Sequence, residues 1–426
     1  MKNKVAKTNF ILLSIIVVLV LVFCVLSVGI PFTNYTFRGF ARSISLGLDF
    51  GDGTSAVYTI EKADFYSKSD DAMTTDAVKI VQQQINDVYG DGCAEIVSDS
   101  KIKITVPDTT ISSEVILTML EMKAETGEDA ETFITGADIE DAEYRMNGTT
   151  HGVYITFTKE GKQKFANLTR TASENSGSIN IYLNKDYDNG QAISISEEIT
   201  TGYAFISAGS KSNAKLYAKQ ITNSKYGLDF TLVEGSTTTV HSNFDTWQKA
   251  MFAVATCLMI VGSMVYLIIK YKQLGLISSL ALMMSALISL ITITLIPQIR
   301  LTIASFVGMT LGYILQFALM LVLLNNCSKE YADGKKLPSS LKSGYKKSVM
   351  PVIDTLVLTM IVCLVAFIFG NVTFVGLCST LSIMLLVNAV TTLGIMRWFI
   401  YMYLSINPGK AKLVNFTRQE GVNEIK

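Results

Sequence analysis

Few residues of this sequence could do chemistry inside a membrane, and one acid stands out among them. Asp354 is the only Asp or Glu within any of six long apolar runs of the chain. A carboxylate in such a run is costly unless it binds an ion, takes up a proton or pairs with a cation, so its default interpretation is functional. It lies about six residues, or roughly 9 Å, from one end of its run. Pairing with Lys346 or Lys347 near that end is an equally good structural interpretation.

Four uncharged residues in the same runs add to this candidate ion-coupling residue. Gln316 and Asn388 could line a relay for protons or ions, although such side chains more often hydrogen-bond neighbouring helices. Gly308 and Gly312 form a Gly-x-x-x-Gly pattern, which lets two helix backbones approach closely. We therefore expect Gly308 and Gly312 to pack helices together.

No catalytic constellation accompanies these residues. The sequence contains neither the Gly-x-Ser-x-Gly elbow of serine hydrolases nor the Gly-rich loop that binds nucleotide phosphates. The two histidines, His151 and His241, lie outside any spacing typical of metal ligands. We expect no enzymatic activity, no metal site and no cofactor.

The composition indicates which elements must position these residues. The 426 residues are 49% hydrophobic and only 17% charged, which is too apolar and too poor in charge for an ordinary soluble protein. The net charge is zero, yet residues 31–247 carry 18 Lys and Arg against 31 Asp and Glu, whereas the remaining residues carry 18 against 5. The acidic block would repel phosphate, so nucleic-acid binding is excluded, and membrane lipid is the expected surroundings of the basic remainder.

Six apolar runs are long enough to cross a membrane. The first, 10–30, follows Lys2, Lys4 and Lys7 and is longer than a signal peptide's core, so we interpret it as an uncleaved anchor. The other five lie at about 249–269, 274–296, 301–324, 349–369 and 373–403. Basic and non-basic loops alternate between them. The positive-inside rule then places both termini in the cytoplasm and residues 31–247 outside.

Residues 31–247 contain both the alternating apolar pattern of strands and the 3.6-residue apolar pattern of helices. Alternating patterns predict four strands, at 101–106, 153–158, 178–183 and 191–196, with a hairpin at Asn189-Gly190. Helical patterns cover 75–89, 112–123, 159–170 and 211–222. The predicted fold is a polytopic α-helical membrane protein with six transmembrane helices and a large α+β, ferredoxin-like extracytoplasmic domain inserted between helices one and two. The expected domains are an anchor (1–30), the external domain (31–247), a five-helix bundle (248–404) and a cytoplasmic tail (405–426).

Several stretches resemble one known family in order and spacing. The segment Leu46-Gly47-Leu48-Asp49-Phe50-Gly51-Asp52-Gly53 resembles its signature at the start of the external domain, and Thr135-Gly136 resembles its mid-domain motif. Gly308-Met309 and Thr380-Leu381-Ser382-Ile383 resemble segments of its membrane helices. The family is that of the SecD-type protein-export membrane proteins, relatives of the resistance-nodulation-division exporters. The resemblance covers roughly residues 1–405.

This resemblance implies an accessory subunit of the Sec translocase in the bacterial cytoplasmic membrane, which assists late export of unfolded polypeptides. The implied partners are a SecF-type six-helix subunit, the SecYEG channel, and the exported polypeptide. One departure stands out, because the family's aspartate in the fourth helix corresponds to Gly312 here. We therefore expect ion coupling to reside mainly in the SecF-type partner. Two alternatives remain, namely a stand-alone exporter of small apolar molecules and a membrane-tethered scaffold with an inert bundle.

Overall fold

The computed structural model describes residues 39–40, 43–124, 131–175, 177–183, 190–296, 298–369, 372–406 and 414–418, with isolated positions before residue 39. Most of the expected anchor, 10–30, lies outside the described residues and stays a prediction. The chain divides into two compact units, Asp52–His241 and Met1–Gly51 with Ser242–Lys426. The expected domain limits at 30, 247 and 404 likewise stay predictions.

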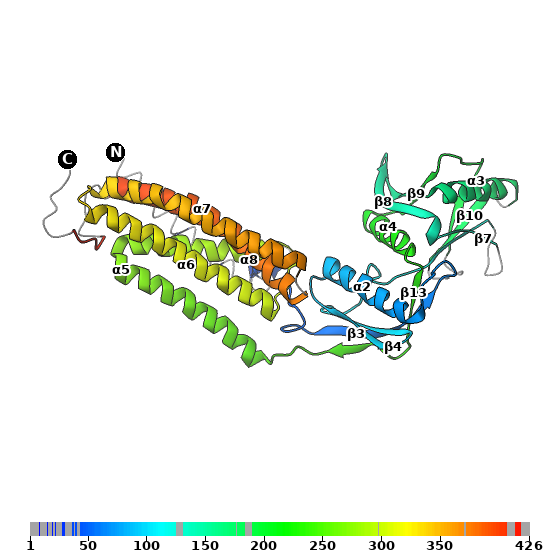
Figure 1. The fold of residues 1–426 in the computed structure, drawn as a ribbon, viewed down its shortest axis with the longest axis horizontal. Coiled ribbons are helices and arrows are strands. Elements are labelled where there is room, and N and C mark those ends of the chain that lie inside the picture. Colours follow the sequence, from blue (N-terminus) through cyan, green and yellow to red (C-terminus); the bar gives the residue numbers. More distant parts are fainter. Residues whose placement is uncertain are drawn as a thin grey trace. The chain divides into compact units, whose positions relative to one another are not determined.

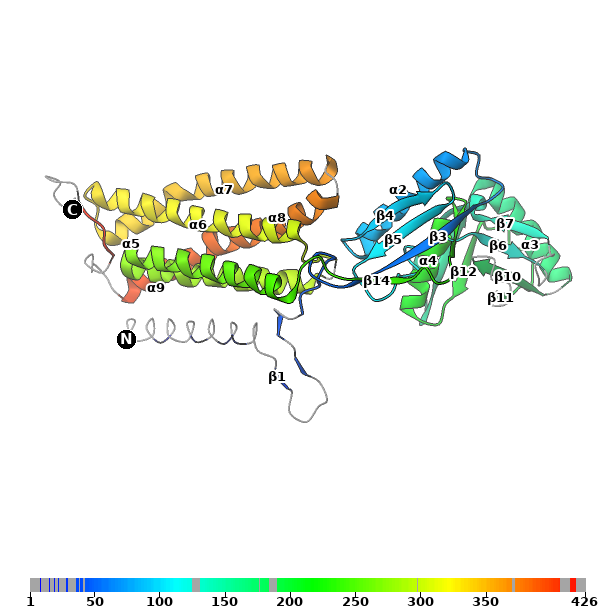
Figure 2. The same ribbon diagram turned by 90° about the horizontal axis from the view of Figure 1, so that it is seen from below.

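The first lobe of the Asp52–His241 unit is an antiparallel sheet in the order β13-β3-β5-β4, with a further strand, β14, on β3. Its strands are β3 (Gly53–Lys62), β4 (Cys93–Ser98), β5 (Lys101–Val106), β13 (Leu228–Leu232) and β14 (Thr238–Val240). Helix α2 (Asp70–Val88) lies along β4 and β5 (Figure 2). It buries Ala77, Val81 and Ile85, which recur every fourth residue and therefore share one face.

The second lobe contains two antiparallel sheets. One has the order β12-β9-β8 and the other β11-β10-β6-β7. The strands are β6 (Leu120–Lys123), β7 (Thr132–Thr135), β8 (Ile139–Asn147), β9 (Thr150–Phe157), β10 (Ser178–Leu183), β11 (Gln191–Ser194) and β12 (Tyr203–Ser207). Helices α3 (Lys159–Glu174) and α4 (Lys211–Ser224) pack on them, as Figure 1 shows. Both helices begin at a residue whose hydroxyl caps a backbone N–H, Thr158 and Ser210 respectively.

The four predicted strands correspond to β5, β9, β10 and β11, and three of the predicted helices to α2, α3 and α4. The helix predicted at 112–123 was wrong. Residues 113–115 form a turn in which the Val115 N–H donates to the Ser112 carbonyl at 3.1 Å, and residues 120–123 form β6 between β7 and β10. Pairing with two strands overrides a local preference for helix.

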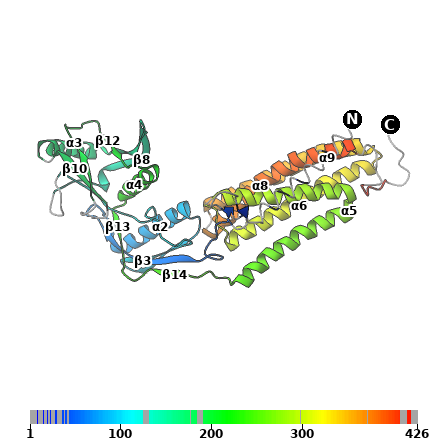
Figure 3. The ribbon, with the colours of Figure 1, turned by 180° about the vertical axis from the view of Figure 1, so that it is seen from behind.

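Four described helices of the other unit are long and apolar enough to cross a membrane, so the chain is a membrane protein. The helical elements are α5 (Thr246–Leu295), α6 (Ile303–Ala332), α7 (Leu337–Phe369), α8 (Val372–Val390) and α9 (Met396–Ile406), the last two joined by a π-helical turn at Thr391–Ile395. Helices α6, α7 and α8 lie side by side (Figure 1), and α5 runs along α8 and α9 (Figure 3). A short two-stranded sheet, β1 (Val28–Gly29) and β2 (Thr36–Phe37), belongs to the same unit.

Helix α5 covers two of the predicted apolar runs. Its 50 residues would extend about 75 Å as one rod, far more than a hydrocarbon core of roughly 30 Å. The backbone breaks at Lys272, whose φ is 51°. After the break the helix folds back, since the Ser279 hydroxyl donates to the Met264 carbonyl at 3.2 Å. Gly275 permits the turn, because a Cβ there would lie 1.9 Å from the Leu267 oxygen.

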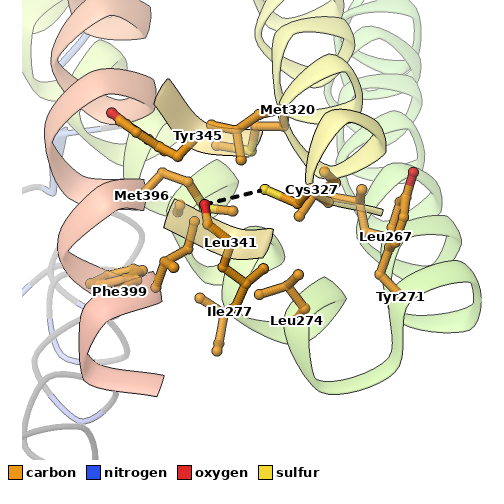
Figure 4. Close-up of a cluster of buried hydrophobic side chains, with 14 of the residues drawn as sticks. Leu267, Tyr271, Leu274, Ile277, Met320, Cys327, Leu341, Tyr345, Met396 and Phe399 are labelled. Atoms are coloured by element: carbon orange, nitrogen blue, oxygen red, sulfur yellow. Dashed lines mark hydrogen bonds between the residues drawn. The ribbon is translucent and has the colours of Figure 1, made fainter. Parts of the chain in front are cut away.

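The bundle core lies where α5, α6, α7 and α9 meet. Figure 4 shows Leu267, Leu274 and Ile277 of α5 facing Cys327 of α6 and Leu341 of α7. The Cys327 thiol points at the Leu341 carbonyl, with 3.7 Å between sulfur and oxygen. These contacts hold the start of α7 in place.

Candidate functional site

An apolar groove of about 480 Å³ lies in the second lobe of the Asp52–His241 unit. Isoleucine side chains line much of it, and we refer to it as the isoleucine groove. They are Ile179, Ile181, Ile193, Ile195, Ile199 and Ile206. Ile193, Ile195 and Ile199 are only half-buried, so the folded chain leaves part of their apolar surface uncovered. Such a surface is typical of a site that binds another apolar group.

Two sheet edges border the isoleucine groove. β11 and β12 are each the last strand of their sheet among the described residues, and residues of both line the cavity. The strands belong to different sheets, and the Gln191 amide joins them by donating to the Ser207 carbonyl at 2.8 Å. An edge strand presents unpaired backbone groups to which an extended peptide can add. The groove thus offers apolar contacts and backbone hydrogen bonds together.

Aromatic side chains form one wall of the groove. Tyr154 of β9 stacks on Tyr203 of β12 with ring centroids 5.3 Å apart, and the Arg145 guanidinium lies 4.0 Å from the centroid of the Tyr154 ring. Arg145 also pairs with Glu143, and it is the one charged residue among those described that line the groove. Stacked tyrosines give a rigid platform for varied side chains. Such a wall can contact apolar and aromatic side chains of varied sequence.

Sequence reasoning did not identify the isoleucine groove. The sequence signal for it is that isoleucines recur at every second position in both 178–183 and 191–196. Each of these strands therefore has one apolar face that needs a cover. Both strands were predicted from the sequence. Whether their isoleucines are covered depends on which sheet β12 joins, and the local sequence does not show this.

In the other unit, residues 46–49 bind the segment that leads into α6. Leu46 bridges Leu301 in parallel, the Gly47 N–H donates to the Leu301 carbonyl at 3.0 Å, and Leu48 follows directly. The Asp49 carboxylate accepts the N–H of Ile303, the first residue of α6, at 2.9 Å. A carboxylate at a helix N-terminus is stabilised by the helix dipole. Asp49 therefore fixes the start of the helix that carries Gly308 and Gly312, whereas Gly53 begins β3.

The Thr135-Gly136 motif is a junction in the second lobe. Asp138 accepts the Thr135 N–H at 3.0 Å and binds Lys164 of α3 at 2.7 Å. A Cβ at Gly136 would lie 2.1 Å from the Ser224 oxygen at the end of α4. Only glycine allows that approach, so the motif joins α3 and α4 to the sheet that contains β7.

Gly308 and Gly312 lie against α8. A Cβ at Gly308 would come within 2.5 Å of the Leu377 oxygen, and one at Gly312 within 2.3 Å of the Met384 Cβ. The two helix backbones are therefore closer than any pair of larger residues would permit. The space beside Gly312 is filled by Met384 of α8.

Gln316 and Asn388 belong to a fully buried polar network beside these glycines. The Gln316 amide donates to the Thr391 hydroxyl at 2.8 Å and accepts from the Thr392 hydroxyl at 3.1 Å. The Asn388 amide donates to the Gly312 carbonyl at 2.8 Å and accepts from Ser285. Every member hydrogen-bonds another helix, which leaves these groups occupied by the protein itself.

Asp354 lies apart from this network, on an exposed face of α7 beside Ile353 and Val357. It has no hydrogen bond or ion pair with another described residue. The suggested pairing with Lys347 is wrong, because Lys347 binds Glu330. Nor do metal ligands gather elsewhere, since no three His, Cys, Asp or Glu side chains in the described ranges could hold an ion together.

No family model matches the sequence, but curated proteins and solved structures resemble it. The chain is 25% identical over 399 residues to the protein translocase subunit SecD of Acidaminococcus fermentans, covering 90% of this chain and 91% of that protein. It is 24% identical over 375 residues to SecD of Dictyoglomus turgidum, covering 84% and 90%. The SecDF of Bacillus subtilis is 21% identical, and the chain spans 52% of its length.

The fold also matches a solved structure. A crystal structure of SecDF in a super-membrane-facing form superposes with a TM-score of 0.68 at 19% identity, covering 94% of this chain and 58% of that chain. At this identity the likeness concerns the fold.

Proposed function

We propose that this chain, a SecD-type protein by these likenesses, is an accessory subunit of the Sec protein translocase that assists late export of unfolded polypeptides. The isoleucine groove is the observation that carries the proposal. Its half-buried isoleucines and two sheet edges suit an extended apolar segment of a polypeptide, whatever its sequence. A globular partner would need a larger matching surface.

The expected affinity suits a transient hold. Burying a side chain such as Leu or Phe contributes about 1.5–3 kcal/mol, and the groove has room for only a few. Ordering an unfolded segment costs about 2–5 kcal/mol, which offsets much of that gain. A segment held weakly is hindered from sliding back while it is bound and can still leave the groove.

Six spans, both termini in the cytoplasm and residues 31–247 outside are the proposed topology. The alternation of basic and non-basic loops supports it, as does the hairpin of α5, which turns one long helix into two. We also propose that the first lobe is ferredoxin-like, with the second lobe inserted before its last strand. Counted along the chain, its strands β3, β4, β5 and β13 are first to fourth, and their order in the sheet is 4-1-3-2.

We further propose that ion coupling resides mainly in a SecF-type partner, beside the SecYEG channel in the bacterial cytoplasmic membrane. The closed polar network of Gln316 and Asn388 supports this division, since its hydrogen-bonding groups bind one another. Replacing Asp354 by Asn should leave export unchanged, measured as secretion of a reporter. A full loss of export from D354N, with normal protein levels, would refute this division.

Photo-crosslinking tests the proposed function directly. A benzophenone amino acid replaces Tyr203 in the groove or Tyr226, a matched tyrosine of similar exposure (46% and 37%) that does not line it. We expect stalled export intermediates to crosslink at Tyr203 and not at Tyr226. Correspondingly, Tyr203→Asp should slow the last stage of export and Tyr226→Asp should not. Equal crosslinking at both positions would refute the groove as the binding site.

A further inference from the structure

A second cavity, of about 270 Å³, lies between α7 and α9 in the membrane unit. We call it the α7–α9 pocket. Three of its lining residues are cations, two are tyrosines and the others are aliphatic. The cations and tyrosines are Lys342, Lys346, Arg397, Tyr345 and Tyr401.

Among the described residues, no carboxylate pairs with the three cations. None forms an ion pair with another described residue, and the nearby acid Glu330 is held by Lys335 and Lys347 instead. Arg397 lies over the rings of Tyr345 and Tyr401, 5.8 and 5.7 Å from their centroids, which fixes its guanidinium at the pocket. The α7–α9 pocket is thus a concentrated site for an anion.

The pocket lies where α7 passes from polar to apolar sequence. Lys342 and Lys346 precede the apolar run, whereas Val349 of the pocket and the exposed Ile353 and Val357 continue the same stripe of α7 into it. On α9, Tyr401 and its neighbour Trp398 are 44% and 51% exposed, as aromatic residues at a membrane–water interface commonly are. An anion bound here would have apolar surface directly beside it.

The pocket wall is part of the bundle core. Tyr345 and Leu341 lie in the cluster shown in Figure 4, and the Tyr345 hydroxyl donates to the Leu393 carbonyl at 2.5 Å in the π-helical turn. The widened turn frees carbonyl groups that an α-helix would use internally. A ligand between α7 and α9 would therefore contact residues that also hold the π-helical turn in place.

We infer that the α7–α9 pocket binds the phosphate of an anionic phospholipid, with the acyl chains lying along the apolar stripe of α7. Basic pockets between transmembrane helices are suited to such headgroups. A free anion would use the cations but not the stripe, and a neutral lipid would use the stripe but not the cations. The combination of both features favours the anionic lipid.

Lipid titration of the purified full-length protein tests this inference. The thermal unfolding midpoint in neutral detergent is measured against added phosphatidylglycerol, phosphatidylcholine or inorganic phosphate. We expect phosphatidylglycerol alone to raise the midpoint with a saturable dependence. Lys346→Gln with Arg397→Gln should weaken that dependence roughly 10- to 30-fold, since each surface cation contributes about 1 kcal/mol to lipid binding.

The matched control removes two cations from the same end of the bundle without touching the pocket. Lys329→Gln with Lys336→Gln should leave the lipid dependence unchanged, and Lys346→Arg should retain it. Equal weakening by both double variants would overturn the inference in favour of diffuse surface charge. So would equal stabilisation by phosphatidylcholine or inorganic phosphate. If the pocket variant is misfolded, photoactivatable phosphatidylglycerol that labels wild-type α6 rather than α7 and α9 would overturn it as well.

Discussion

Replacing Gly308 by alanine should separate α6 from α8. The added Cβ would lie 2.5 Å from the Leu377 carbonyl oxygen and 2.3 Å from the Thr380 hydroxyl. The hydroxyl can rotate away, but the carbonyl belongs to the backbone of α8. Because ordinary contact begins at 3.4 Å, the two backbones must move apart by about 0.9 Å at this level.

The magnitude follows from the contacts that such a shift weakens. Overpacking a well-packed interface costs about 1–3 kcal/mol, and the Thr380 hydroxyl also donates to the Ser305 carbonyl across the same interface. Gly262 of α5 is the matched control, since a Cβ there meets nothing within 4 Å. Alanine at that position should be neutral or slightly stabilising, as expected from helix propensity alone.

The assay is unfolding of the purified protein in mixed micelles with increasing sodium dodecyl sulfate, followed by circular dichroism. We expect Gly308→Ala to lower the free energy of unfolding by about 1–3 kcal/mol, and Gly262→Ala to leave it unchanged or raise it by up to about 1 kcal/mol. Equal effects of the two substitutions would refute the close approach of α6 and α8 as the reason for glycine at position 308.

Three further predictions concern single carboxylates. Glu330 is 3% exposed and bound by Lys335, Lys347 and Ser343. Glu330→Gln should therefore destabilise the α6–α7 connection by about 1–3 kcal/mol and speed hydrogen exchange there. Asp333→Asn, at an exposed position of the same connection, should change neither. Asp49→Ala should speed exchange at the N–H of Ile303 while amides in the middle of α6 keep their rates; unchanged exchange at Ile303 would contradict the capping role. The ammonium of Lys68 and the hydroxyl of Tyr66 lower the pKa of Asp76, so its charge stabilises the fold above the ordinary carboxyl pKa and the effect is lost as pH falls through the lowered value. Asp76→Asn should therefore lower the unfolding midpoint near pH 7 but not near pH 2, and an equal difference at both would show that the charge is not responsible.

Elements with a clear hydrophobic period were predictable from the sequence. Strand β5 and helix α4 follow local patterns of apolar residues, and the chain needs no distant contact to select them. The segment 112–123 lacks that independence, because Val115 and Leu117 point to a core completed only by β13, more than 100 residues later. A prediction from neighbouring residues alone takes no account of β13.

The isoleucine groove could not be predicted for a related reason. Its strands were expected, but the cavity exists because β11 and β12, only eight residues apart, enter different sheets. A sequence pattern indicates which side chains are apolar and not which of them remain uncovered. The α7–α9 pocket likewise depends on Arg397 lying beside Lys346, some 50 residues away in the chain.

In the membrane unit, glycine at position 312 determines how the neighbouring polar residues pack. With glycine at position 312, α8 approaches until Met384 occupies the space that an aspartate side chain would need. Asn388 then donates to the Gly312 carbonyl, a bond that depends on this short distance, and Gln316 completes the network through Thr391 and Thr392. Amide and hydroxyl groups bound in this way stabilise helix association because no water competes for them. The polar residues around Gly312 thus hold the helices together.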